Sequence, residues 1–150
     1  MAALRVLSFA AARGRVGSVV FDGETLIDWR ISGKAAESEA DAIAHISRLV
    51  ADFSPDVVVT EEIETARHKG KHTLGIIAAI AETADQAGLL AVSVPREHHF
   101  PNKYDEADAI ALRFPELAPW KPPKRCFYEN EPRNTVLFEA VALASQLTRG

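Results

Sequence analysis

Three apolar segments joined by tight turns open the chain, and they limit its possible folds more than any other feature. Residues 4–9, 16–21 and 25–30 are rich in β-branched and other apolar side chains, which predicts three strands. The pair Asp22-Gly23 between the second and third is a strong signal for a hairpin turn. Because strands with such short connections pair in opposite directions, the sequence predicts an antiparallel meander.

The middle of the chain alternates between helical and strand patterns. Apolar residues at three- and four-residue spacing predict helices over residues 39–53 and 71–87. A short β-branched run at residues 57–59 lies between them, and another buried-type strand, residues 89–94, follows the second helix. Two strands separated by a helix predict parallel pairing.

The last third is predicted to be helical. We expect helices over residues 104–114 and from Pro132 towards Leu147, separated by a proline-rich surface connection over residues 115–123. The predicted order over the single domain 1–150 is therefore β-β-β-α-β-α-β-α-α. This is an α/β protein with a mixed five-stranded sheet and helices on its faces, which is the plan of the ribonuclease H-like fold.

Composition excludes several classes of protein. No segment approaches the roughly 18 apolar residues of a membrane span, and Arg5 interrupts the apolar start, so we expect a first strand and no membrane association. The single Cys126 excludes an internal disulfide framework and favours a cytoplasmic location. The net charge of −4 means that any nucleic-acid binding would depend on local basic patches.

The most informative functional motif follows the short strand at residues 57–59. The strand ends in two adjacent carboxylates, Glu61 and Glu62, which either present acid at the tip of a sheet or mark where the strand exits into solvent. A basic segment comes next, and five of its six residues can carry positive charge: Arg67, His68, Lys69, Lys71 and His72. Carboxylates beside cations suit a metal site next to a phosphate-binding surface.

These residues resemble a known family. Residues 55–62, the basic loop and the helix beginning Thr73-Leu74-Gly75 resemble the corresponding part of RuvC-like Holliday-junction resolvases, especially their phage-type relatives. Residues 129–142 resemble the final helix of such proteins. The resemblance implies a metal-dependent endonuclease in which paired Mg²⁺ or Mn²⁺ ions hydrolyse a phosphodiester. It implies Glu61 and Glu139 as catalytic metal ligands, with Glu131 a weaker candidate.

The same resemblance implies a DNA partner, branched or structured, and a homodimer. The residues that would hold the DNA backbone are Arg67, Lys69, Lys71 and His72. Arg13 and Arg15 are expected in a hairpin turn near the tip of the first strand, where they can also touch a phosphate.

A second group of acids competes for the last ligand position. Asp105 and Asp108 are three residues apart and would share one face of a predicted helix. This segment also resembles the acidic end of related resolvases. Acidic residues on an exposed helix face are, however, usually only solvated. We therefore keep Asp105, Asp108 and Glu62 as alternative acids beside Glu139.

The chain departs from the family pattern at one position. The family's first strand ends in an aspartate that bridges both metals, and the matching residue here is Ala10; no Asp or Glu occurs before Asp22. Three hypotheses remain open. The chain is an endonuclease with an altered or impaired active site, a catalytically inactive DNA-binding protein of the same fold, or a structural or regulatory partner protein with no nucleic-acid role.

Overall fold

The computed structural model describes residues 3–122 and 134–149, and at its centre lies a five-stranded sheet. The strands lie in the order β3-β2-β1-β4-β5. Their bounds are β1 Arg5–Ala12, β2 Arg15–Asp22, β3 Thr25–Ser32, β4 Val57–Glu61 and β5 Leu90–Val94. The first three strands form the predicted antiparallel meander, and β4 and β5 add to β1 in parallel. The mixed sheet predicted from the sequence is confirmed.

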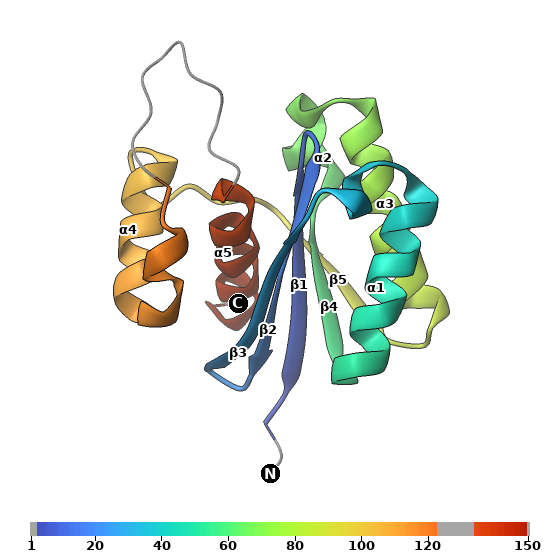
Figure 1. Cartoon of the computed structure of the whole chain (residues 1–150), viewed down its shortest axis with the longest axis horizontal. Helices are drawn as coiled ribbons and strands as arrows, with labels where there is room; N and C mark the ends of the chain where they lie inside the picture. Colours follow the sequence, from blue (N-terminus) through green and yellow to red (C-terminus); the bar gives the residue numbers. More distant parts are fainter. Residues whose placement is uncertain (1–2, 123–133, 150) are drawn as a thin grey trace.

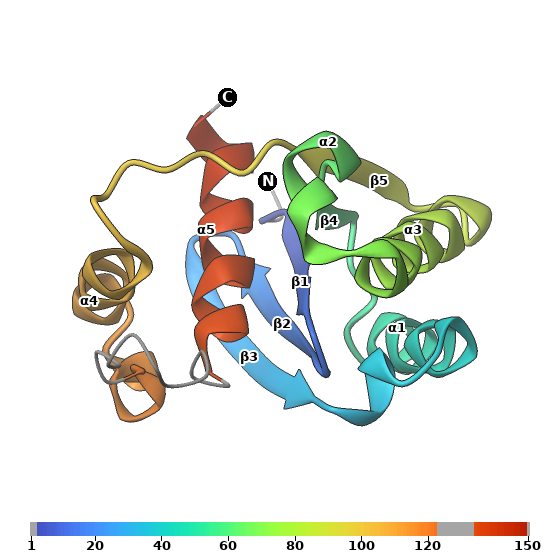
Figure 2. The same ribbon diagram turned by 90° about the horizontal axis from the view of Figure 1, so that it is seen from above.

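Helices cover both faces of this sheet (Figures 1 and 2). On one face lie α1 (Glu39–Phe53) and α3 (Lys71–Gln86). On the other lies α5 (Thr135–Arg149), with α4 (Lys103–Arg113) packed outside it. The short elements are α2 (Ile63–Ala66) and three 3₁₀ turns, η1 (Lys34–Ala36), η2 (Arg67–Lys69) and η3 (Pro115–Trp120). No helix in the described part of the chain is long and apolar enough to cross a membrane.

Two segments differ from the sequence prediction. The basic segment, expected as a loop, forms the 3₁₀ turn η2 and, after Gly70, the first residues of α3. The proline-rich connection was predicted to lie on the surface, but its Leu117 is fully buried in the core under η3. A single Leu among prolines has no periodic apolar partners, so its burial left no pattern in the sequence.

The face of the sheet under α5 is packed very closely. A Cβ added to Gly17 on β2 would lie 2.7 Å from the carbonyl oxygen of Val136 on α5. Ser8 on β1 donates its hydroxyl to the carbonyl oxygen of Ala140 at 2.7 Å. Ala10, which pairs with Gly17 across β1 and β2, is buried on this same face. Small residues therefore seat the α5 backbone against the sheet, and this fixes where the side chains of α5 lie.

Candidate functional site

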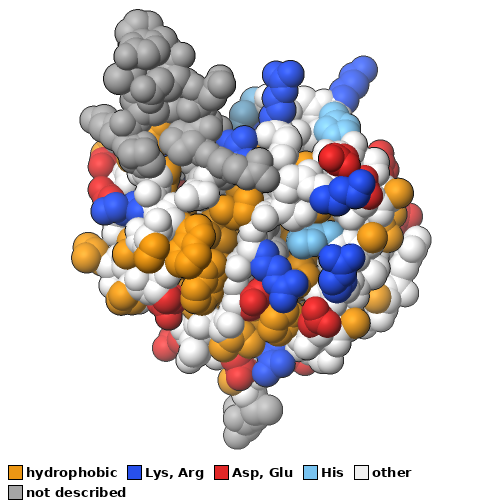
Figure 3. Space-filling model, viewed as in Figure 1, with side chains coloured by type: hydrophobic (Ala, Val, Ile, Leu, Met, Phe, Trp, Pro, Cys, Tyr) orange, Lys and Arg blue, Asp and Glu red, His pale blue; other side chains and the backbone are white. Residues whose placement is uncertain are grey.

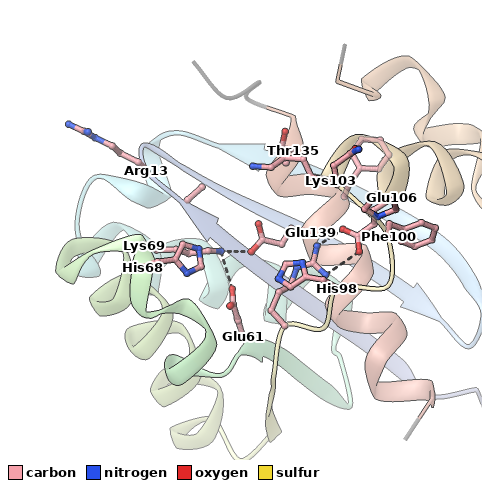
Figure 4. Close-up of a pocket in the computed structure, with 15 residues that line it drawn as sticks. Arg13, Glu61, His68, Lys69, His98, Phe100, Lys103, Glu106, Thr135 and Glu139 are labelled. Atoms are coloured by element: carbon pink, nitrogen blue, oxygen red, sulfur yellow. Dashed lines mark hydrogen bonds and ion pairs between the residues drawn. The ribbon is translucent and has the colours of Figure 1, made fainter. Parts of the chain in front are cut away.

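A pocket of about 450 Å³ opens at the end of the sheet where β1 and β4 finish (Figure 4). It receives residues from β1, the β1–β2 turn, β4, η2, the segment after β5, α4 and α5. Its chemically active side chains are Arg13, Glu61, His68, Lys69, Arg96, His98, Lys103, Glu106, Thr135 and Glu139. Residues from both ends of the chain thus meet in one pocket.

Glu61 points into the pocket because side chains alternate between the two faces of the sheet along strand β4. Val57 and Val59 face α5, so the side chain two residues further on points the same way. Glu61 is only 2 % exposed, and its Oε2 accepts a hydrogen bond from Thr65 Oγ1 at 2.9 Å. The neighbouring Glu62 occupies the N-cap position of α2 without a capping hydrogen bond from its side chain, and it does not line the pocket. Of the two adjacent carboxylates, the structure places only Glu61 in the site.

Lys69 lies between the two acids that the sequence singled out. Its Nζ is 3.0 Å from Glu61 Oε1, forms an ion pair with Glu139 Oε1, and donates to the carbonyl oxygen of Ala11 at 2.8 Å. Glu61 is buried, with 1 % of its side chain exposed, and the side chains of Lys69 and Glu139 are partly buried, with 11 % and 14 % exposed. Gly70, at φ +91°, lets the chain turn from η2 into α3 directly after Lys69.

The charges of this cluster are perturbed by burial and by one another. Burial acts to raise the pKa of Glu61, but the Lys69 ammonium outweighs it, and the pKa lies below its ordinary value. Burial raises the pKa of Glu139 above its ordinary value, although Lys69 opposes the change. Burial acts to lower the pKa of Lys69, but the two carboxylates outweigh it, and the pKa lies above its ordinary value. The ammonium is therefore charged at neutral pH.

The metal centre implied by the resemblance does not fit these side chains. Among the described residues no group of three or more His, Cys, Asp or Glu could hold a metal ion. Ser8 of β1 is level with Val59 of β4, so two residues further on Ala10 is level with Glu61 and on the same face. Its methyl group offers no oxygen. The two carboxylates that remain already bind the Lys69 ammonium.

A second buried ion pair lies beside the first. Arg96, just after β5, donates hydrogen bonds to Glu106 of α4 from both terminal guanidinium nitrogens, and Nη1 lies 3.1 Å from Glu106 Oε2. The backbone N–H of Arg96 also donates to Thr65 Oγ1 at 3.0 Å, so Thr65 links this pair to Glu61. Neither residue was predicted from the sequence. The available signal for Glu106 was its spacing of four residues before the apolar Ile110, which places both on one side of the predicted helix.

The alternative acids lie elsewhere. Asp105 is exposed and interacts with Asn102 at the start of α4, and Asp108 is exposed and pairs with Lys121 at 3.1 Å. Neither lines the pocket. Glu131 lies outside the described residues. The structure therefore brings Glu61 and Glu139 together, with Glu106 nearby.

Three of the cations expected to bind DNA are exposed near the pocket. Arg13 lies at its rim and points away from the acids (Figure 4). Arg67 flanks the lining residue His68 and pairs with Glu64 at 3.0 Å, and Lys71 is exposed at the start of α3. Lys and Arg side chains project from the end of the molecule where α2 lies (Figure 3). This end therefore carries a local basic patch.

Two other expected cations are engaged with the backbone. Arg15 donates to the carbonyl oxygen of Arg13 at 2.9 Å, and its side chain is partly buried. His72 Nε2 lies 2.7 Å from the carbonyl oxygen of Ala36. These contacts hold the turn and the start of α3 in place, so both residues are better suited to positioning the basic patch than to forming it.

Comparison with known proteins identifies the fold. Neither a protein-family model nor a curated protein sequence gives a significant match. Among solved structures, T. thermophilus RuvC in complex with a Holliday junction substrate matches with 16 % identity and a TM-score of 0.61, over 98 % of this chain and 96 % of that one. The Fowlpox virus resolvase in complex with Holliday junction DNA matches with 13 % identity and a TM-score of 0.59, over 97 % of each chain.

A third solved structure, the yeast mitochondrial Holliday junction resolvase, matches with 11 % identity and a TM-score of 0.58, over 98 % of this chain and 78 % of that one. The architecture of this chain is thus that of the ribonuclease H-like junction resolvases. At these identities the comparison establishes the fold, and the function has to be argued from the site.

Proposed function

We propose that this chain binds branched or structured DNA across the pocket end of its sheet, without cleaving it. The observation that carries the proposal is the basic patch of Arg13, Arg67 and Lys71 around a pocket whose own acids are occupied by Lys69. The fold supports a junction as the bound DNA, because two of the similar structures hold Holliday junction DNA.

The electrostatics of the pocket agree with binding rather than repulsion. A DNA backbone carries dense negative charge, and two bare carboxylates at the contact surface would repel it. Lys69 offsets much of that repulsion from inside the pocket, while the exposed cations face outward to the phosphates. A protein with a net charge of −4 can therefore still attract DNA at this end.

The test is a gel-shift titration of a labelled four-way junction and a matched duplex, in EDTA. We expect the wild-type protein to bind the junction more tightly than the duplex, with an affinity that falls as salt rises. The variant Arg13→Ala/Arg67→Ala/Lys71→Ala should bind more weakly and show a shallower salt dependence, by up to about 0.9 in slope for each phosphate that is no longer neutralised.

Arg48→Ala is the matched control. Arg48 is also an exposed arginine, but it lies on α1, which contributes no residue to the pocket. Its loss should leave junction affinity nearly unchanged. Equal junction affinity of the triple variant and the wild type would contradict the proposal. Absence of any DNA binding by the wild type would also contradict it and would favour a structural or regulatory partner protein.

A second candidate function is a Mg²⁺- or Mn²⁺-dependent endonuclease with an altered active site. It is favoured by the convergence of Glu61 and Glu139 in one pocket. As placed, however, these acids hold an ammonium, the nearby Glu106 is paired with Arg96, and no three acids among the described residues are placed to hold one metal ion. Repeating the junction assay with Mg²⁺ or Mn²⁺ separates the candidates, since cuts that disappear in Glu61→Gln would establish the endonuclease.

A homodimer and a cytoplasmic location stay predictions from the sequence. We propose the dimer because a junction presents symmetric arms to its partner. Sedimentation of the protein alone and with one equivalent of junction tests it: a mass of two chains, free or bound, is expected, and a single chain in both states would contradict it.

A further inference from the structure

We infer that the Lys69 ammonium is the resident cation of the Glu61–Glu139 centre, and that it keeps divalent metal ions out of the resting protein. The inference concerns the same pocket as the proposed DNA binding, but it does not depend on DNA. It deepens that proposal by stating why the site would bind DNA without metal.

Three oxygens surround the ammonium. The Ala11 carbonyl and Glu139 Oε1 accept hydrogen bonds from the Nζ of Lys69, and Glu61 Oε1 lies 3.0 Å away as an ion-pair partner. The oxygens come from β4, α5 and β1, so two neighbouring strands and the helix that packs on them form the binding site of the ammonium (Figure 4). Two carboxylate oxygens and a carbonyl are also the hard ligands that a divalent cation would take. The lysine therefore occupies the place that such an ion would need.

The charge count favours the lysine over a metal. Counted as ionised groups, the cations Lys69 and Arg96 and the carboxylates Glu61, Glu106 and Glu139 of the two linked ion-pair clusters carry a formal net charge of −1. A dication entering beside both cations would meet repulsion from each of them at short range. Removal of Lys69 leaves a net charge of −2 and an empty binding site, and a single divalent ion would balance it.

The way in which Lys69 is held explains why it stays in place. Its side chain is 11 % exposed, so leaving the pocket would expose two buried carboxylates without a partner. Arg67, two residues earlier on the same turn, is exposed and pairs with the surface acid Glu64. The two cations are neighbours in sequence but differ in role, which makes Arg67 a matched control.

The experiment measures Mn²⁺ binding by the loss of free-ion electron paramagnetic resonance signal, without DNA. We expect the wild type and Arg67→Ala to show only weak Mn²⁺ binding, which Glu61→Gln does not change. Lys69→Ala should bind Mn²⁺ at least about tenfold more tightly than the wild type, because its two carboxylates are then free to act as ligands. Adding Glu61→Gln and Glu139→Gln to Lys69→Ala should abolish the gain.

A thermal-unfolding series on the same proteins gives a second readout. Mn²⁺ should raise the melting temperature of Lys69→Ala and leave that of the wild type unchanged relative to EDTA, since a ligand stabilises only the protein that binds it. If Lys69→Ala does not fold, the wild type and Glu61→Gln still decide the matter.

Two results would overturn the inference. One is stabilisation of the wild type by Mn²⁺ that Glu61→Gln removes, because the metal would then displace the lysine. The other is a folded Lys69→Ala that binds Mn²⁺ no better than wild type. Neither result depends on junction affinity in EDTA, so failure of this inference is distinct from failure of the proposed DNA binding.

Discussion

The two faces of the sheet are packed in different ways. Towards α1 and α3, the sheet presents large apolar side chains to large apolar side chains: Leu7, Phe9 and Val20 meet Ile46, Leu49, Ile76 and Ile80. Towards α5, Gly17 brings the strand backbone against the helix backbone, and Ser8 bonds directly to a helix carbonyl. Apolar side chains fill both faces, but on the α5 face close contact between strand and helix backbones is added to the side-chain packing.

The difference has a functional consequence. A layer of apolar side chains can absorb part of a small volume change by shifting rotamers, at some cost, whereas two backbones in contact must move as whole elements. The face with the close backbone contact is the one that carries Ala10, Glu61 and Glu139. The position of the charged cluster is therefore determined by the most closely fitted part of the molecule.

The largest expected effect is on the α5 side, at the Arg96–Glu106 pair. Arg96→Met leaves Glu106 buried without a counter-charge, and we expect a loss of about 3–5 kcal/mol in the free energy of unfolding. Urea denaturation measures it. Glu106→Gln added to Arg96→Met should recover much of the loss, and a double variant as unstable as the single one would show that the charge itself is not the cause.

The next largest effect is expected from substituting a glycine on the α5 side of the sheet, and a glycine on the other side serves as the comparison. Gly17→Ala places a Cβ 2.7 Å from the Val136 carbonyl oxygen, so α5 must move, at a cost of about 1–3 kcal/mol. Gly75→Ala, in α3, meets only the end of the Glu39 side chain at 3.0 Å, and helix propensity should stabilise it by about 0.5–1 kcal/mol. Thermal unfolding of both variants gives the signs, and destabilisation by both would contradict the contrast.

A smaller effect is expected at Ser8. Ser8→Ala removes one hydrogen bond between β1 and α5, and we expect a loss of about 1 kcal/mol by denaturant titration. Ser18→Ala is a control on β2, because Ser18 Oγ is buried without a hydrogen-bond partner among the described residues. That substitution should be close to neutral, and equal losses at both positions would argue against a specific role of the Ser8 bond.

The smallest effect lies on the opposite face and depends on pH. Burial, aided by the charges of Arg30 and Arg48, holds the pKa of His45 in α1 below its ordinary value of 6.5. The unfolded chain therefore binds a proton more readily, so the stability due to neutral His45 is complete above pH 6.5 and is lost as pH falls through the folded pKa.

His45→Gln removes this titration and keeps a polar side chain. Denaturation at about pH 7.5 and about pH 5.5, on either side of the ordinary histidine pKa, should show a smaller loss of stability on acidification for the variant than for wild type. The exposed histidines are common to both proteins and cancel in the comparison. Identical pH dependence would mean that His45 is not held neutral by its burial.

Much of the fold was predictable because its signals are local. The hairpin at Asp22-Gly23, the β-branched run of β4 and the apolar spacing of α1 and α3 each depend on residues close together in the chain. Glu61 was predictable at the strand end for the same reason, and Glu139 through the resemblance of the final helix. The burial of Leu117 was not, since one residue forms no period.

The local patterns of the sequence thus predicted the order of the strands and main helices and the mixed sheet, and they placed Glu61 at a strand end. Only the tertiary structure decided that Lys69 pairs with Glu61 and Glu139 and that Arg96 pairs with Glu106. Lys69 and Glu139 are 70 residues apart, and their contact depends on how closely α5 sits on β1 and β2. Opposite charges that lie far apart in the chain form an ion pair only where the fold brings them together, and no local spacing in the sequence encodes such a contact.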